Sequence, residues 1–124
     1  MRILVCGGRD FNDYRFLSSI LDKLCKDRGY HNEYMPEGVK IIAGKAKGAD
    51  TLAIDWAVTN WLPFQEFPAD WEKHGKAAGY IRNQQMLNEG KPDLVVAFPG
   101  GKGTAMMVSL AKKAGIEVIE VGTS

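Results

Sequence analysis

The stretch DLVVAFPGGKGT at residues 93–104 decides the fold, because an apolar run leads directly into a glycine-rich turn. The run at 94–98 has the composition of a strand buried on both faces of a parallel sheet, and the proline after it has no amide to extend the strand. The glycines leave room for a ligand beside the first free amides of a helix, which attract anions. We therefore predict a phosphate-binding turn, with an empty strand-to-helix connection as the alternative. The residues expected at the ligand are Pro99, Gly100, Gly101, Gly103 and Thr104.

Two further apolar runs end in the same way. RILVC at 2–6 is followed by GGRD, and VKIIA at 39–43 is followed by GKAKGAD. In a parallel sheet the three turns lie at one edge, at the carboxyl ends of the strands, where ligands bind in open α/β folds. The residues that these two turns are expected to contribute are Gly7, Gly8, Arg9, Asp10, Gly44, Lys47, Gly48 and Asp50.

Strand and helix patterns alternate along the whole chain. The predicted strands span 2–6, 39–43, 63–67, 94–98 and 117–121, and the predicted helices span about 13–27, 48–60, 77–89 and 103–114. This alternation predicts an α/β fold, a Rossmann-like three-layer sandwich with a parallel five-stranded sheet. Right-handed crossovers, with a reversal of strand order between the first and fourth strands, predict the order 3-2-1-4-5. The first and last glycine turns then lie side by side at the switch point, and the ligand should straddle them.

Composition narrows the classes of protein. The chain has 124 residues, of which 45% are hydrophobic, enough for one core between two helix layers. We therefore expect a single domain over residues 1–124. The formal net charge of +1 gives no general attraction for nucleic acid, and no extended basic face is evident. A DNA-binding role is therefore not expected.

The amino-terminal sequence and the cysteines lead us to expect a cytoplasmic protein. The sequence starts directly with strand residues, without the basic and apolar regions of a signal peptide, and no run is long enough to cross a bilayer. No membrane partner is therefore expected. Cys6 and Cys25 have neither redox nor zinc-binding spacing and are expected to be buried reduced thiols. No metal site and no other cofactor is predicted.

Two well-known nucleotide-binding motifs are absent. The first turn reads GGRD in place of G-x-G-x-x-G, and the second strand ends in Ala43-Gly44 where an NAD site usually carries an acid for the ribose hydroxyls. The second turn lacks the Gly-Lys-Ser/Thr ending of a Walker loop. Neither an NAD-linked dehydrogenase nor a Walker-type ATPase is expected.

The segment at 69–83 is predicted to be a binding loop, because it follows the third strand at the same edge and mixes charged, aromatic and small residues. Trp71 can stack on a base, and Asp70 can accept hydrogen bonds from ribose hydroxyls. Arg82 and Asn83 can reach phosphate or sugar. The alternatives are that Trp71 fills an apolar gap, Asp70 caps the next turn and Arg82 pairs with an acid.

Four motifs in fixed order resemble a known family. GGRDF at 7–11, GKAKGADTLAIDWA at 44–57, ADWEKHGKAAGYIRNQQML at 69–87 and DLVVAFPGGKGTAMM at 93–107 are similar to the small SLOG-superfamily proteins related to YspA. That superfamily also holds cytokinin-activating phosphoribohydrolases and the DNA-processing protein DprA. The resemblance implies a Rossmann-like domain that binds nucleotides or nucleotide-derived ligands. It also suggests a homodimer, and an exposed Trp56 or Trp61 would support such an interface.

The sequence departs from the related hydrolases at one place. The phosphoribohydrolases carry an apolar residue and two glutamates after PGG-x-GT, whereas this chain has Ala105, Met106 and Met107 at those positions. A thioether neither holds negative charge nor moves a proton, so we expect a binder without catalytic activity. Its expected ligand is a phosphorylated nucleoside, for example an NAD-derived or ADP-ribose-like compound. The expected role is that of a sensor or sequestering module. The alternative is a hydrolase that cleaves an N-glycosidic or phosphoanhydride bond. In that case Asp70 or Asp10 is the expected catalytic carboxylate, with Asp50 also near the edge.

Overall fold

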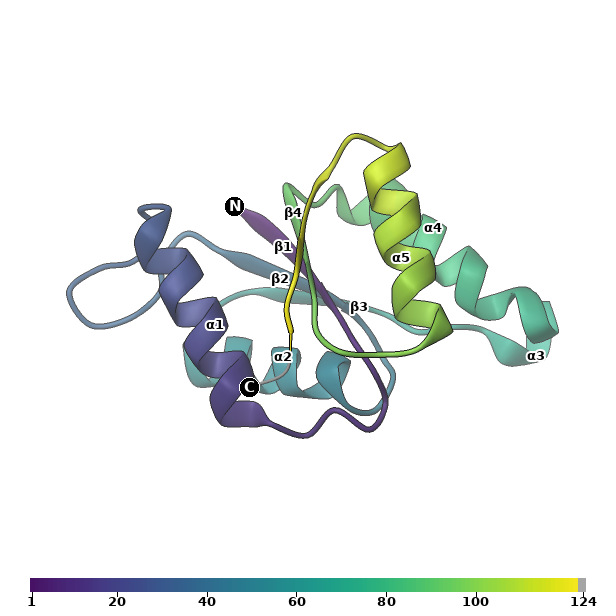
Figure 1. Ribbon diagram of the computed structural model, residues 1–124, viewed down its shortest axis with the longest axis horizontal. Helices are drawn as coiled ribbons and strands as arrows, with labels where there is room; N and C mark the ends of the chain where they lie inside the picture. The colour runs from purple at the N-terminus through teal and green to yellow at the C-terminus, as the bar shows by residue number, and fades with distance from the viewer. Residues whose placement is uncertain (123–124) are drawn as a thin grey trace.

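The computed structural model describes residues 1–122 and forms one parallel five-stranded sheet with helices on both sides (Figure 1). The elements follow one another in the order that alternating strand and helix patterns predict. They are β1 Arg2–Cys6, α1 Tyr14–Asp27, β2 Lys40–Gly44, α2 Ala49–Thr59, β3 Phe64–Phe67, α3 Trp71–His74, the 3₁₀ turn η1 Gly75–Ala77, α4 Ala78–Gly90, β4 Leu94–Ala97, α5 Lys102–Lys113 and β5 Glu117–Glu120.

The predicted sheet topology is confirmed. The strands are ordered β3-β2-β1-β4-β5, and every adjacent pair is parallel. Strand β1 lies at the centre, with Val5 paired to Val96 of β4 and Ile3 paired to Ile41 of β2. The switch in strand order therefore falls between β1 and β4, which places the first and last glycine turns next to each other.

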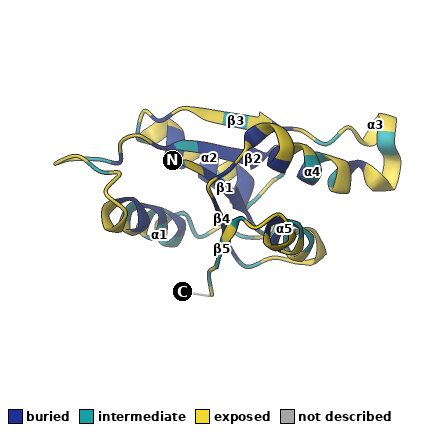
Figure 2. Cartoon of the chain, turned by 90° about the horizontal axis from the view of Figure 1, so that it is seen from above, coloured by how far each residue is buried: buried dark blue, intermediate teal, exposed yellow. Residues whose placement is uncertain are grey.

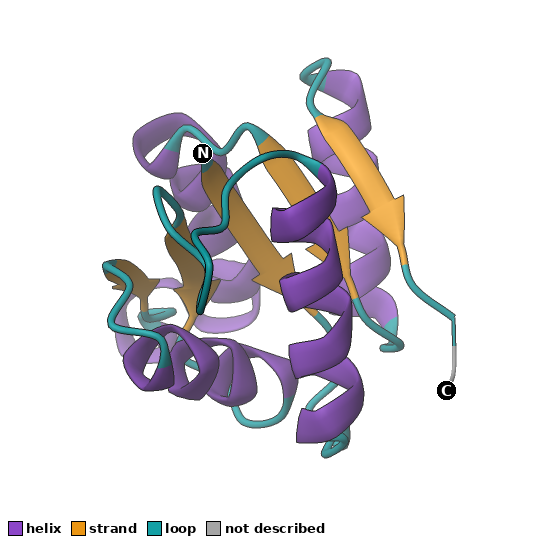
Figure 3. Ribbon diagram, turned by 90° about the vertical axis from the view of Figure 1, so that its left-hand side faces the viewer, coloured by secondary structure: helices purple, strands orange, loops and turns teal. Residues whose placement is uncertain are grey.

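Helices lie on both sides of the sheet (Figure 3), and successive residues of the central strand contribute to two separate cores. Ile3 and Val5 pack with the apolar side chains of α1 and α2 in one core. Leu4 packs with those of α4 and α5 in the other. Buried residues accordingly gather in the sheet and on the helix sides that face it (Figure 2). The two layers hold the loops at the carboxyl edge of the sheet in place.

The predicted element boundaries are within one or two residues of those observed, but the expected loop at 69–83 is wrong in part. Residues Trp71–His74 form the short helix α3, the turn η1 follows, and α4 begins at Ala78. The Asp70 carboxylate accepts the amide hydrogen of Lys73 at 3.0 Å, which is the side-chain capping that starts a helix. The segment is therefore a capped helical turn.

The two tryptophans of the second helix region have different surroundings. Trp56 is fully buried in the core, and its indole Nε1 donates to Asp22 of α1 at 3.2 Å. Trp61 follows the helix with 89% of its surface exposed. Trp56 is therefore a core residue, and only Trp61 of this pair is available to contact another molecule.

Cys6 and Cys25 are buried free thiols, as the sequence predicts. Burial raises the pKa of the Cys25 thiol to about 11, so it stays protonated at neutral pH. Over residues 1–122, no helix combines the length and the apolar composition needed to cross a membrane.

Candidate functional site

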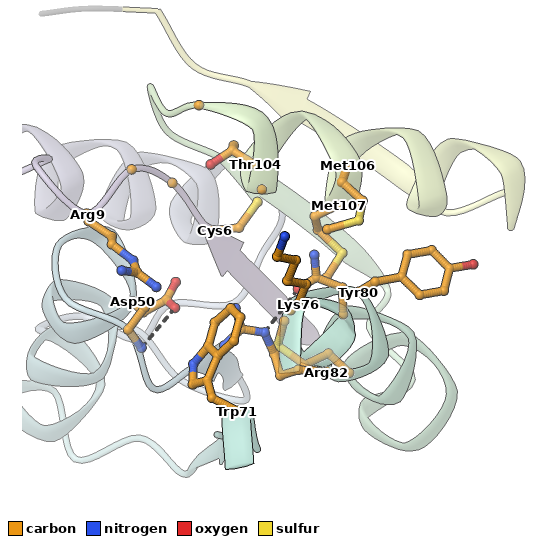
Figure 4. Close-up of a pocket in the computed structure, with 18 residues that line it drawn as sticks. Cys6, Arg9, Asp50, Trp71, Lys76, Tyr80, Arg82, Thr104, Met106 and Met107 are labelled. Carbon is orange, nitrogen blue, oxygen red and sulfur yellow. Dashed lines mark hydrogen bonds between the residues drawn. The ribbon is translucent and has the colours of Figure 1, made fainter. Parts of the chain in front are cut away.

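A cavity of about 490 Å³, called here the central cavity, opens at the carboxyl edge of the sheet beside the switch point (Figure 4). It receives side chains and backbone from all three predicted turns, from α3 and from α4. Its lining residues are Cys6, Gly7, Gly8, Arg9, Ala46, Asp50, Trp71, Lys76, Gly79, Tyr80, Arg82, Asn83, Met86, Gly101, Gly103, Thr104, Met106 and Met107.

The three turns are fastened to one another by backbone hydrogen bonds. The amide of Gly8 donates to the carbonyl of Pro99 at 2.9 Å, joining the first turn to the last. The carbonyl of Gly8 accepts the amide of Ala49 at 3.2 Å, joining the first turn to the start of α2. The edge of the cavity is therefore a single hydrogen-bonded unit.

The glycines of these turns fall into two groups. At Gly7 an added Cβ would lie 2.6 Å from the Cβ of Ala49, and at Gly100 it would lie 2.6 Å from the amide nitrogen of Gly8. At Gly101 and Gly103 an added Cβ would meet no atom within 4 Å. The first group permits close packing of the turns, and the second leaves open space beside the start of α5.

Asp50 is a buried carboxylate in the wall of the central cavity, with 7% of its surface exposed. Its Oδ2 accepts the amide of Ala46 at 3.3 Å. Burial raises the pKa of Asp50 to about 6, although the charges of Arg82 and Arg9 act in the opposite direction. The group therefore changes charge close to neutral pH.

Arg82 reaches into the cavity from α4 and is held by two neighbours. Its Nε donates to the Oδ1 of the buried Asn83 at 3.1 Å, and its Nη1 donates to the carbonyl of Phe67 at the long distance of 3.5 Å. The Arg82 side chain fits here because Gly44 has no side chain. An added Cβ at Gly44 would clash with Arg82 Nη1 and would lie 2.7 Å from Asp50 Oδ2. Arg82 and Asp50 thus both lie beside Gly44.

Aromatic and cationic side chains border the open side of the central cavity. Trp71 and Tyr80 are about half exposed, at 51% and 48%, and Lys76 lies between them (Figure 4). Thr104 and Met106 lie across the cavity, on α5 (Figure 4). The cavity therefore combines an exposed aromatic face, three cations counting Arg9, and one buried carboxylate, a mixture suited to an anionic ligand that carries a ring.

A second cavity of about 480 Å³, called here the α1 cavity, lies beside the first at the start of α1. It is lined by Asp10, Pro99 and Gly100. The sequence predicted these three residues to share one site with the residues of the central cavity. Its lining residues are Gly8, Arg9, Asp10, Phe11, Asn12, Asp13, Phe16, Pro99, Gly100 and Gly101.

Four of the predicted site residues lie outside both cavities. Gly44 and Lys47 line a smaller third cavity of about 300 Å³ on the outer side of the second turn. Gly48 has φ of +83° and packs against the backbone of the first turn. Asp70 caps α3 through Lys73, the alternative role foreseen for it. The remaining predicted residues meet in the central cavity or in the α1 cavity.

Sequence reasoning missed part of the lining from α4. Gly79, Tyr80 and Met86 lie in the central cavity together with the predicted Arg82 and Asn83. Positions 79, 82, 83 and 86 share one face of a helix, so helical spacing from Arg82 would have found two of the missed residues. Cys6 was interpreted only as a buried thiol, and it also lines the cavity. Its pKa is raised to about 12 by burial and by the charge of Asp50, so it does not act as a thiolate.

Among residues 1–122, no group of three or more His, Cys, Asp or Glu side chains is arranged to hold a metal ion.

Fold and site together define a class: a Rossmann-like α/β protein with a glycine-lined cavity at the switch point of its sheet. The chain belongs to the YspA, cpYpsA-related SLOG family, whose sequence model matches residues 1–74. It is also similar to the "Gene 61 protein" of Mycobacterium phage D29, with 37% identity over 131 residues, covering 98% of this chain and 96% of that protein. Membership of this family is consistent with a nucleotide-related function.

Proposed function

We propose that this protein binds a nucleotide or a nucleotide-derived phosphorylated ligand, such as an NAD-derived or ADP-ribose-like molecule, as a sensor or sequestering module. One observation carries the proposal. The central cavity is lined by open glycines at the start of α5, by a half-exposed tryptophan and by three cations. Each part of this arrangement suits one part of a nucleotide.

The anionic part is accommodated by the glycine edge. Gly101 precedes α5 and Gly103 lies in its first turn, where amides without helical partners point toward an incoming anion. Arg82 is oriented by Asn83 and Phe67 and supplies a fork of donors that matches phosphate geometry. The exposed ring of Trp71 offers a stacking surface for a base.

The absence of the expected carboxylate favours binding over turnover. Met106 and Met107 occupy the positions where the similar hydrolases carry glutamates, and both line the central cavity. A thioether supplies neither negative charge for an oxocarbenium-like transition state nor a proton. Neither methionine can therefore replace the glutamate.

A hydrolase remains the second candidate function, and Asp50 is the observation that favours it. Its carboxyl is buried in the cavity wall with a pKa of about 6, close to the value that suits a general acid or base near neutral pH. Asp10 and Asp70, the carboxylates first expected in that role, lie respectively in the α1 cavity and on the cap of α3. If the protein is an enzyme, we propose Asp50 as its acid–base group.

Calorimetric titration with AMP and with ADP-ribose tests the binding function. Gly103→Leu places a side chain in open space at the glycine edge and should weaken ligand binding at least about tenfold while the protein stays folded. Ser109→Leu, on the exposed side of the same helix, is the matched control and should bind as the unchanged protein does. Equal affinity in both variants, or no heat with any nucleotide, would contradict the proposed site.

A turnover assay separates the two candidates. Incubation with AMP, NAD and ADP-ribose, followed by chromatography of released base or phosphate, should show negligible product. Rapid release that is lost in Asp50→Asn would establish the hydrolase instead. Asp55→Asn, an exposed position on the same helix, is the control for nonspecific effects of the substitution.

We also propose that the chain forms a homodimer, for which Trp61 offers an exposed aromatic side chain. Light scattering on the unchanged protein and on Trp61→Ala tests this. A monomer in both cases would contradict the proposal.

A further inference from the structure

The central cavity and the α1 cavity are neighbours of nearly equal size, about 490 and 480 Å³. They share Gly8, Arg9 and Gly101, which form the seam between them. Gly101 has no atom within 4 Å of an added Cβ, and the Arg9 side chain is exposed. A molecule bound in one cavity can therefore continue over the seam into the other.

The two cavities differ in charge. Lys76 and Arg82 line the central cavity alone, and they outnumber its carboxylate Asp50. The α1 cavity has two carboxylates of its own, Asp10 and Asp13, and no cation besides the shared Arg9 among its lining residues. A phosphate is therefore attracted to the central cavity and the seam and repelled from the α1 cavity, which suits an uncharged group with hydroxyls.

The α1 cavity also has an aromatic wall. Phe11 and Phe16 line it, and both are half-buried. Their rings pack against the buried Phe98, with ring centroids 5.2 and 6.3 Å away respectively. Asp13 accepts the amide hydrogen of Phe16 at 3.1 Å, so the start of α1 is held next to these rings. The wall is therefore apolar and packed against the core, and the carboxylate of Asp10 lines the same cavity.

Building on the proposed function, we infer that the α1 cavity is a second half-site for the same ligand. The ligand is then longer than a mononucleotide: a nucleoside and its phosphates occupy the central cavity and the seam, and a second sugar or base lies against Phe11 with its hydroxyls toward Asp10. A pyrophosphate-linked molecule with two nucleoside or sugar ends has this distribution of charge. A mononucleotide leaves the α1 cavity empty.

Titration calorimetry with AMP and ADP-ribose, at one pH and one salt concentration, tests the second half-site. ADP-ribose should bind at least about tenfold more tightly than AMP, because its second ribose gains contacts that AMP lacks. Asn12→Trp fills the α1 cavity from an exposed position, and Phe11→Leu removes an aromatic ring while keeping an apolar contact to Phe98. Both should weaken ADP-ribose about tenfold and leave AMP affinity unchanged within about twofold.

Asn88→Trp, at an exposed position of α4 outside both cavities, is the matched control, and thermal unfolding without ligand confirms that each variant is folded. Equal affinity for AMP and ADP-ribose, with no effect of Asn12→Trp on either, overturns the second half-site and leaves the proposed function intact. Failure of the unchanged protein to bind either molecule overturns the proposed function and this inference with it. Selective loss of the ADP-ribose advantage in Asn12→Trp supports the second half-site.

Discussion

The glycines at the edge of the sheet serve two different purposes, although they look alike in the sequence. Gly48 and Gly100 are pressed against the backbone of the first turn, so that a methyl group at either position has no room. Gly101 and Gly103 face open space at the start of α5. The packed glycines join the turns into one unit, and the open glycines leave that unit accessible to a ligand.

This difference shows how the same residue type, glycine, can serve both folding and ligand binding. Turns that approach closely align their backbone amides, and the open positions beside them expose the amides at the start of α5. The packed group should therefore respond to substitution with lost stability, and the open group with lost affinity. Four predictions test or sharpen this division.

The largest effect is expected from Gly48→Ala. The residue has φ of +83°, and an added Cβ would lie 2.7 Å from the carbonyl oxygen of Arg9, so backbone strain and a clash with another turn act together. We expect a loss of about 3–5 kcal/mol in the free energy of unfolding, measured by urea denaturation. Gly29→Ala is the matched control, since Gly29 has φ of +82° with nothing within 4 Å of an added Cβ. It should cost only about 1–2 kcal/mol. Equal losses would show that close approach contributes nothing.

The second prediction concerns the buried charge beside the packed turns. Asp50 has its pKa raised from 3.8 to about 6, so ionisation costs the folded protein about 3 kcal/mol at pH 7 and above. Asp50→Asn keeps the shape of the side chain and its acceptor for Ala46. It should therefore stabilise the free protein by up to that amount.

The pH dependence of this effect fixes its cause. Stability contributed by protonated Asp50 is fully present below pH 4 and is lost as the pH rises from about 4 through 6. The gain from Asp50→Asn should accordingly be absent below pH 4 and constant above about pH 7, as thermal unfolding at several pH values can measure. A gain that does not vary with pH would assign the effect to packing.

The third prediction concerns the arginines of the central cavity. A forked guanidinium bond to phosphate contributes roughly 1.5–3 kcal/mol, so Arg82→Ala and Arg9→Ala should each weaken nucleotide binding at least about tenfold. For Arg9→Ala the unfolding midpoint without ligand should change little, because Arg9 is exposed. For Arg82→Ala the midpoint should fall at neutral pH, because the buried Asp50 carboxylate loses the charge of Arg82. Arg15→Ala, at an exposed position of α1 outside both cavities, is the control. Normal binding in both cavity variants would remove the arginines from the site.

The smallest effect is expected from Gly103→Ala. The residue lies in the first turn of α5, and a methyl group there meets nothing within 4 Å. Because alanine is the better helix former, the variant should gain up to about 1 kcal/mol in stability, visible as a raised unfolding midpoint. Affinity for AMP should fall at the same time. A variant that binds normally would show that the open space at Gly103 is not used by the ligand.

Much of the fold could be predicted because its signals are local. The apolar runs at 2–6 and 94–98 are long enough, and apolar enough, to be strands buried on both faces, and the alternation with helices leaves few topologies. The loop prediction for 69–83 was wrong in part, because capping by Asp70 is a weak local signal that the sequence could offer only as an alternative. For the site, the prediction that the turns meet at one edge of the sheet included most of the residues that line the two cavities.

The sequence by itself predicted the strands, their turns and the residue types at the edge where the turns meet, because strand and turn preferences act over a few neighbouring residues. The strand order followed from the alternation of strands and helices together with the handedness of their crossovers. Only the tertiary structure divided the edge into two cavities and placed both Asp50 and Arg82 beside Gly44. It also decided which glycines are packed and which are open. The reason is physical: burial, clash and the pKa of a carboxyl depend on atoms contributed by residues far apart in the chain, and no local pattern records which of them become neighbours.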